Sequence, residues 1–206
     1  MTAAGLAAGA TAGCAAISIV PEPPQLYTLT PKSTFDPGLP AVDWQLLVEP
    51  PVAAAGLDTV RIALSPTPTT VDYYASVAWT DRAPAMVQRL LVESFENSGK
   101  IVGVSRDAIG LRSDYVLSGD LREFQAEEWN GAGTRARVRF NAKLITMPER
   151  QIVASETFEF VEPATGAGFE GVIAAFDQAL GKTMRRVVEW TLVQGERHRN
   201  GAAGSS

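Results

Sequence analysis

The chain has 206 residues, of which 46% are hydrophobic and 20% are charged, a composition typical of one globular domain with flanking tails. Its formal net charge of -5 argues against a nucleic-acid-binding surface, which needs a dense basic patch. The single cysteine, Cys14, and the single histidine, His198, exclude a disulfide framework, a cysteine-based metal cluster and a histidine-rich metal site. No run of eighteen apolar residues is present, so the sequence predicts no membrane-spanning helix.

The first thirteen residues carry no charge and consist almost entirely of Ala, Gly and Thr, ending directly at Cys14. A lipoprotein signal peptidase accepts such a segment, because its cleft admits only small side chains before the scissile bond. Residues 1–13 are therefore predicted to be a truncated lipoprotein signal remnant, and the thiol of Cys14 is the predicted lipidation site. The alternative is a floppy N-terminus that contains an incidental cysteine.

Residues 14–41 are rich in proline. Proline fixes φ and lacks a backbone donor, so this stretch is predicted to be an extended, largely unpaired tether between an acylated Cys14 and the domain. For the second half of the segment the alternative is an irregular arm that lies on the domain. At the other end of the chain, residues 195–206 are polar and rich in Gly, Ala and Ser, and they are predicted to be a disordered tail.

The predicted domain spans residues 42–194, and its first half combines strands with one helix. Asp81 is the predicted cap of that helix, whose apolar residues recur at helical spacing until Gly99 stops it. Runs rich in β-branched and aromatic residues predict strands on both sides of the helix. These strands cover residues 42–48, 59–64, 71–79 and 101–104.

The clearest strand signal lies in the second half, where apolar residues alternate with Arg135, Arg137, Arg139, Asn141 and Lys143. One face is therefore buried and the other is wet. This assignment predicts that Val138→Asp unfolds the domain, whereas Arg137→Ala costs little. The neighbouring elements are a hairpin partner at 114–128, joined through 130–133 and bulged between Leu121 and Phe124, a third strand at 151–161, and an amphipathic helix from Phe169 to Thr191.

The resulting order is β-β-β-α-β-β-β-β-α. Two helices are too few to cover both faces of a doubly wound sheet, but they suit one face of a mixed sheet. The predicted fold class is therefore α+β in two layers, with a mixed, mostly antiparallel sheet and two main helices packed on one face.

Charged residues near the hairpin have two interpretations. The carboxylates of Glu123, Glu127 and Glu128 could form an acid/base pair, but cross-strand pairing with the arginine row is more ordinary and contributes at most about 1 kcal/mol per pair. The row Arg135, Arg137 and Arg139 could also contact anionic lipid or a partner. The sequence contains no catalytic or phosphate-binding motif, and it predicts no catalytic residue, no metal site and no cofactor.

An aromatic group stands where the third strand leads into the helix. Tyr73, Tyr74 and Trp79 could line an apolar groove that contacts a partner or a lipid. Core packing is the alternative, because alternating aromatic residues in a strand usually face a core.

Longer segments carry a resemblance to a known family. They include YTL at Tyr27–Leu29, YYASVAWTDRAPAMVQRLLVESFENSG at Tyr73–Gly99, DYVLSGDLREFQAE at Asp114–Glu127 and FEGVIAAFDQAL at Phe169–Leu180. With these segments the chain resembles the ABC-type transport auxiliary lipoproteins of the PqiC-like family, from Cys14 to about Leu192. The incomplete signal peptide is the one departure.

The resemblance implies a non-catalytic periplasmic lipoprotein that works with an ABC permease, its ATPase and a substrate-binding protein of the mammalian-cell-entry (MCE) type. Such systems move phospholipids or other hydrophobic molecules between the inner and outer membranes of Gram-negative bacteria. Cys14 would carry the acyl chains, and Ala15 in place of aspartate after it favours the outer membrane over the inner one. The family also implies docking, with a homo-oligomeric ring as one form, and no nucleic-acid partner.

A second function remains open at this point. A lipoprotein of similar α+β build could activate a periplasmic enzyme, or pilot an outer-membrane secretion complex, without any lipid traffic. An enzyme would need a deep polar pocket with converging titratable groups.

Overall fold

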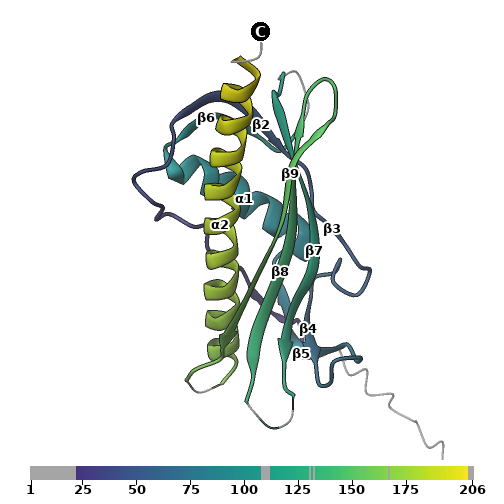
Figure 1. The fold of residues 1–206 in the computed structure, drawn as a ribbon. Helices are drawn as coiled ribbons and strands as arrows, with labels where there is room; N and C mark the ends of the chain where they lie inside the picture. The colour runs from purple at the N-terminus through teal and green to yellow at the C-terminus, as the bar shows by residue number, and fades with distance from the viewer. Residues whose placement is uncertain (1–21, 108–111, 130, 132, 167, 204–206) are drawn as a thin grey trace, which may run out of the picture.

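A computed structural model describes residues 22–107, 112–129, 131, 133–166 and 168–203 of the chain. It contains one mixed sheet of nine strands and two helices, which confirms the predicted α+β class. Figure 1 shows the long C-terminal helix α2 running along the strands β7, β8 and β9. The strands are β1 Gln25–Tyr27, β2 Val42–Val48, β3 Val52–Ala53, β4 Arg61–Ser65, β5 Asp72–Trp79, β6 Ile101–Ser105, β7 Tyr115–Glu127, β8 Arg135–Thr146 and β9 Ile152–Pro163, and the helices are α1 Ala83–Ser98 and α2 Phe169–Ala203.

The longest strand, β7, organises the sheet. Along one edge it pairs antiparallel with β8 over its whole length, and β8 pairs antiparallel with β9. The predicted hairpin and third strand are therefore confirmed. The register of β7 and β8 shifts between Leu121 and Glu123, so the predicted bulge is present and brings Leu121 and Phe124 onto the buried face.

The other edge of β7 is shared by three short parallel strands. Strand β2 pairs with its beginning, β3 with its middle and β4 with its end. Strand β6 then extends the sheet beyond β2, whereas β5 and β1 extend it beyond β4. The sequence missed β1 and β3, because strands of two or three residues have no periodicity and form only by pairing with longer neighbours.

Helix α1 follows the sequence signals except at its N-cap. Pro84 sits in the first turn, where a missing donor is harmless, and Gly99 ends the helix with a φ of 62°. The predicted cap is wrong: Arg82 is the N-cap and makes no side-chain capping bond. The carboxylate of Asp81 instead accepts a 2.7 Å hydrogen bond from the backbone N–H of Arg82, one residue too early to cap the helix.

Helix α2 corrects the predicted disordered tail over residues 195–203, because it continues to Ala203, whereas residues 204–206 lie outside the described residues. Its last turns pack against the start of β2 and β7. A Cβ atom at Gly195 would lie 2.6 Å from the Cζ2 atom of Trp44, so glycine permits the close approach. The hydroxyl of Tyr115 donates to the carbonyl of Gly195 over 3.2 Å and lies 3.0 Å from Nδ1 of His198. Residues that read as a polar tail are thus held by buried aromatic side chains.

The second half of the predicted tether is also part of the domain. Beyond β1, Leu29 is 3% exposed within the core, and the backbone N–H and hydroxyl of Thr30 both donate to Asp177 on α2. The backbone N–H of Lys32 donates to Ser94 on α1 over 2.9 Å. The prediction of a free tether is therefore wrong from Gln25 onward, and the alternative, an arm that lies on the domain, is confirmed there. Proline prevents regular pairing, but it does not prevent side chains from packing.

The arm predicts a stability effect that a free tether could not have. We expect Leu29→Ala to lower the free energy of unfolding by about 2–4 kcal/mol, because it removes a buried side chain and leaves a cavity. Leu26→Ala, three residues earlier at a position that is 59% exposed, should change it by less than about 0.5 kcal/mol. Urea unfolding of both variants measures the difference. Equal midpoints would show that the arm does not pack.

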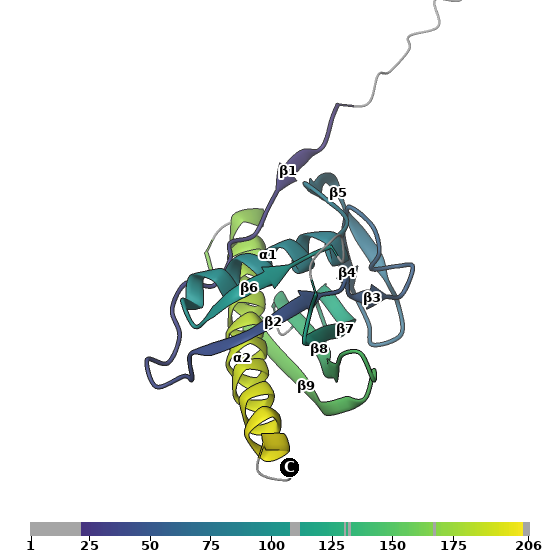
Figure 2. The ribbon, with the colours of Figure 1, turned by 90° about the horizontal axis from the view of Figure 1, so that it is seen from above.

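One hydrophobic core lies between the sheet and both helices. Helix α1 packs against β2 and β6, whereas α2 packs against β7, β8 and β9, and the two helices contact each other. At the centre the ring of Trp79 meets those of Phe124 and Phe176, with centroids 5.6 and 5.2 Å away. In Figure 2, seen from above, α1 crosses α2 and lies beside β6.

Candidate functional site

Cys14, the predicted lipidation site, lies outside the described residues. Its acylation therefore stays a prediction. The described part of the chain nevertheless limits how far such an anchor could lie from the domain. Ten residues separate Cys14 from Gln25 in β1, and a fully extended chain of that length reaches about 35 Å. A lipid anchor at Cys14 would hold the domain within that distance of the bilayer surface.

The three aromatic residues do not form a common groove. Trp79 is 1% exposed in the core, so its predicted contact with a partner or lipid is wrong and the core-packing alternative is correct for it. Ser76, with a φ of 59°, interrupts β5, and the register of β4 and β5 shifts in this stretch. This irregularity breaks the alternation of faces that the sequence argument assumed.

Tyr73 and Tyr74 remain half-buried on separate sides of β5. The Tyr73 hydroxyl donates to the carbonyl of Gly56, and the guanidinium of Arg61 lies 3.7 Å from its ring centroid. Tyr74 packs edge-on against Phe169, and its hydroxyl donates to Glu128 over 3.2 Å. Burial, followed by the charge and the hydrogen bond of Glu128, raises the pKa of Tyr74 far above its ordinary value. Both tyrosines already have internal partners.

The arginine row is an ion-pair ladder with neighbouring strands. Its arginines pair with Glu123 and Glu127 of β7, as the sequence predicted, and also with Glu159 of β9. Glu128 is not part of the ladder. It accepts hydrogen bonds from the hydroxyls of Thr134 and Tyr74 instead.

Glu127 is the centre of this ladder and is 0% exposed. Arg137 Nε donates to one of its carboxylate oxygens over 2.6 Å, and Arg135 Nε donates to the other over 2.8 Å. The ring of Trp129 lies 5.1 Å from the Arg135 guanidinium and 5.6 Å from that of Arg137. Desolvation lowers the pKa of Arg137, but the bond and charge of Glu127, with the charges of Glu159 and Glu123, outweigh it and raise the pKa. The ladder's charge is balanced internally, which favours a structural role over contact with anionic lipid.

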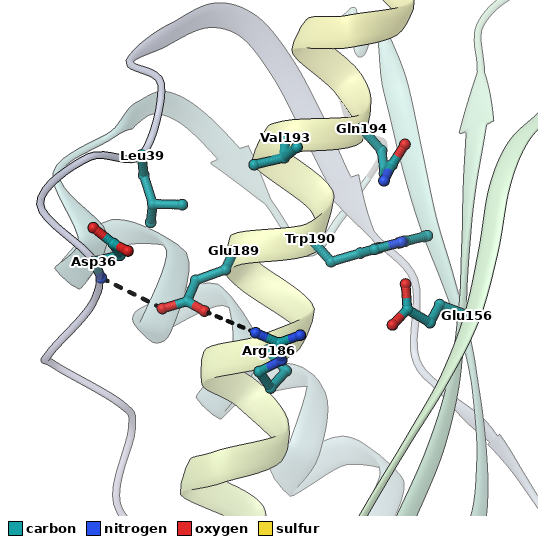
Figure 3. Close-up of a pocket in the computed structure, with 8 residues that line it drawn as sticks. All are labelled: Asp36, Leu39, Glu156, Arg186, Glu189, Trp190, Val193 and Gln194. Atoms are coloured by element: carbon teal, nitrogen blue, oxygen red, sulfur yellow. Dashed lines mark hydrogen bonds and ion pairs between the residues drawn. The ribbon is translucent and has the colours of Figure 1, made fainter.

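A groove that the sequence did not predict lies between the arm, α2 and β9 (Figure 3). It has a volume of about 340 Å³. Its charged lining is mainly acidic, with Asp36, Glu156 and Glu189 beside Arg186. The Glu189 carboxylate accepts a hydrogen bond from the backbone N–H of Asp36 over 3.4 Å and lies 3.8 Å from Arg186. The groove is lined by Asp36, Leu39, Glu156, Arg186, Glu189, Trp190, Val193 and Gln194. Sequence reasoning missed it because one wall of the groove, formed by Asp36 and Leu39, belongs to the arm, which was predicted to be a tether.

Grouped metal ligands and membrane-spanning helices are both missing from the described part of the chain. Among the described residues, no three His, Cys, Asp or Glu side chains are grouped so that they could hold a metal ion. In the groove of Figure 3, the Glu189 carboxylate pairs with Arg186 and accepts a hydrogen bond from the backbone N–H of Asp36. None of the helices in the described part of the chain is long and apolar enough to cross a membrane.

Comparisons with known proteins identify a matching family and similar structures. A family model for the ABC-type transport auxiliary lipoprotein component matches residues 26–188. The crystal structure of protein XCC0632 from Xanthomonas campestris is similar, with a TM-score of 0.81 and 36% sequence identity, over 85% of this chain and 99% of that chain. A second crystal structure, of an uncharacterized protein, has a TM-score of 0.65 over 81% of this chain and 97% of that chain, but at 14% identity it supports the fold alone.

One curated relative is longer than this chain. The uncharacterized protein bll6063 of Bradyrhizobium diazoefficiens is 27% identical over 172 residues, which is 81% of this chain but 44% of that relative. The chain thus spans less than half the length of this relative. The similarity therefore concerns one region of the longer protein.

Proposed function

Because the chain belongs to the family of ABC-type transport auxiliary lipoprotein components, we propose that it is the lipid-anchored, non-catalytic partner of an ABC system of the MCE type. Such a system moves phospholipid or another hydrophobic molecule between the inner and outer membranes. The family match over residues 26–188 carries the proposal, and the 36% identical structure from Xanthomonas campestris supports the fold over 85% of this chain. Nucleotide hydrolysis would take place on a separate ATPase subunit.

The proposed location of the protein is the periplasmic side of the outer membrane. Acyl chains on Cys14 would hold it there, since one chain gives marginal membrane binding, at about 0.8 kcal/mol per buried CH₂, and two or three make dissociation negligible. The residue after Cys14 is Ala15, not the aspartate of an inner-membrane retention signal. The partners would be the MCE-type substrate-binding protein and the permease with its ATPase.

The anchor can be tested by Cys14→Ser, expressed behind a complete lipoprotein signal peptide. We expect the variant to fold normally but to leave the membrane fraction, because no described helix can replace the acyl chains as an anchor. Fractionation after a salt wash, with mass spectrometry of the N-terminal peptide, measures both localisation and acylation. The control is the wild-type chain behind the same signal. Retention of Cys14→Ser after the wash would overturn lipid anchoring.

The same membranes test the transport role. Detergent extraction of the wild-type protein should recover an MCE-type protein and a permease, identified by mass spectrometry together with the bound lipids. Recovery of a secretion complex or of a periplasmic enzyme, without those components, would contradict the proposal even if anchoring were confirmed.

A further inference from the structure

The sheet has four outer edges in the described part of the chain, formed by β1, β3, β6 and β9. An edge strand carries a row of unpaired backbone N–H and C=O groups that can pair with another chain. Proteins usually block such an edge with charged residues, with proline, or by keeping the strand very short. The four edges differ in how far they are blocked.

Three of the edges are protected. Strand β9 carries Glu156, Glu159 and Glu162 and ends at Pro163, which has no backbone donor. Strand β1 has only three residues and β3 only two. None of the three presents an uncharged run of five or more residues.

Strand β6, Ile101–Ser105, has none of these protections. Its sequence, IVGVS, contains no charge and no proline. Within the described residues it pairs with β2 alone, so its outer edge forms no ladder. Val102 is 98% exposed, which is the highest exposure among the large hydrophobic residues of the described chain. A fully exposed valine on an unprotected edge leaves apolar surface and backbone groups available in one place.

We propose that the outer edge of β6 is a docking strand, to which an extended, uncharged segment of a partner protein adds as a further strand. In this mode backbone hydrogen bonds supply affinity, and the side chain opposite Val102 supplies specificity. The central residues of the segment are neutral and include an apolar side chain, because a charge there would be desolvated against Val102 without a partner.

The size of β6 decides between a partner segment and a second copy of this chain. The strand has five residues, whereas a stable protein interface uses roughly 20–30 residues on each side. Pairing of β6 with β6 would therefore be too small to hold a dimer. A segment of a larger partner needs no such area on β6, because other contacts of that partner would hold the complex together. Pairing with β6 would then fix how the segment is aligned.

The position of β6 suits such a role. It joins the sheet through β2 at the start of β7, whereas β5 and β1 join it through β4 at the end of β7. Leu117 and Ala126 mark these two attachments, which lie nine residue steps apart on β7, or about 30 Å. Figure 1 shows β6 and β5 at opposite ends of the molecule. The docking strand thus lies far from the end at which the N-terminal arm enters the fold.

The test uses the full chain and a defined probe, an acetylated and amidated hexapeptide of alternating threonine and valine. We expect saturable binding with slowed amide hydrogen exchange at Val102–Ser105. Val102→Lys should weaken binding about tenfold or more, since it removes an apolar contact and places a charge on the edge. Val52→Lys is the matched control, because Val52 is 69% exposed on β3 and should leave affinity unchanged. Melting temperatures confirm that both variants fold.

A second peptide, N-methylated at every residue, keeps the side chains but cannot pair as a strand. Equal binding of this peptide, protection on β9 instead of β6, or the absence of saturable binding would overturn the proposal. A concentration-dependent dimer that Val102→Lys abolishes would assign β6 to a second copy and would overturn it as well. The measurement needs neither membranes nor a transport system, so its failure is separate from failure of the proposed function.

Discussion

Val138→Asp is expected to abolish the cooperative folding of the domain. Val138 is 0% exposed at the middle of β8, opposite Phe124 on β7 and Phe160 on β9. Aspartate is close to valine in size, so the change adds a charge without a large change in volume. An unpaired buried charge costs several kcal/mol, which is comparable to the 5–15 kcal/mol that usually stabilises a domain. Circular dichroism and urea unfolding should show no native baseline.

The matched control places the same residue on the other face of the same strand. Lys143 is exposed, and Lys143→Asp should change the free energy of unfolding by less than about 1 kcal/mol. If the two variants unfold at the same urea concentration, the faces of β8 are assigned backwards.

Arg137→Ala is expected to lower the free energy of unfolding by about 2–4 kcal/mol, although the sequence alone predicted a small cost. The reason is Glu127, which is 0% exposed and receives its shortest bond from Arg137. Loss of that bond leaves a buried carboxylate oxygen without its donor. Arg135 remains on the other oxygen, so the loss is smaller than for a fully orphaned charge.

Two further variants isolate this cause. Arg139→Ala removes an arginine of the same row whose carboxylate contacts are 3.7 and 3.8 Å long and partly exposed, so it should cost less than about 1 kcal/mol. In a Glu127→Gln background, Arg137→Ala should cost less than it does alone, because no buried charge remains to be compensated. Equal costs for the two arginines, or no coupling with Glu127, would contradict this explanation of the ladder.

Sequence signals were most informative where the structure of a segment depends on residues close to it in the chain. Gly99 ends α1 in the left-handed region, as glycine after a helix commonly does. Along β8, Asn141 was expected to be wet but is 6% exposed, and its amide donates to Thr157 of β9. The alternation nevertheless assigned the core-facing residues of β8 correctly, and the change of phase between Leu121 and Phe124 located the bulge. These signals depend on neighbours within a few residues, so no tertiary information is needed to read them.

The errors fall where distant residues decide the outcome. Leu29 is buried only because α1 and α2 lie beside the arm, and nothing in its proline-rich surroundings predicts that contact. Residues 195–203 remain helical because Trp44 and Tyr115, about 80 to 150 positions away in the chain, hold α2 there. Because β5 is irregular at Ser76, Trp79 lies in the core, whereas Tyr74 packs against Phe169 at the start of α2.

The sequence by itself therefore determined the fold class, the order of the main elements, the inward face of β8 and the pairing of the arginines with Glu123 and Glu127. Each of these follows from period, turn residues or direct cross-strand opposition, which are local properties of the chain. Only the tertiary structure decided that Glu127 is buried, that the arm forms one wall of the groove, and that β6 is an unprotected edge. Burial and edge position depend on which elements lie side by side, and that arrangement is set by the packing of the whole domain.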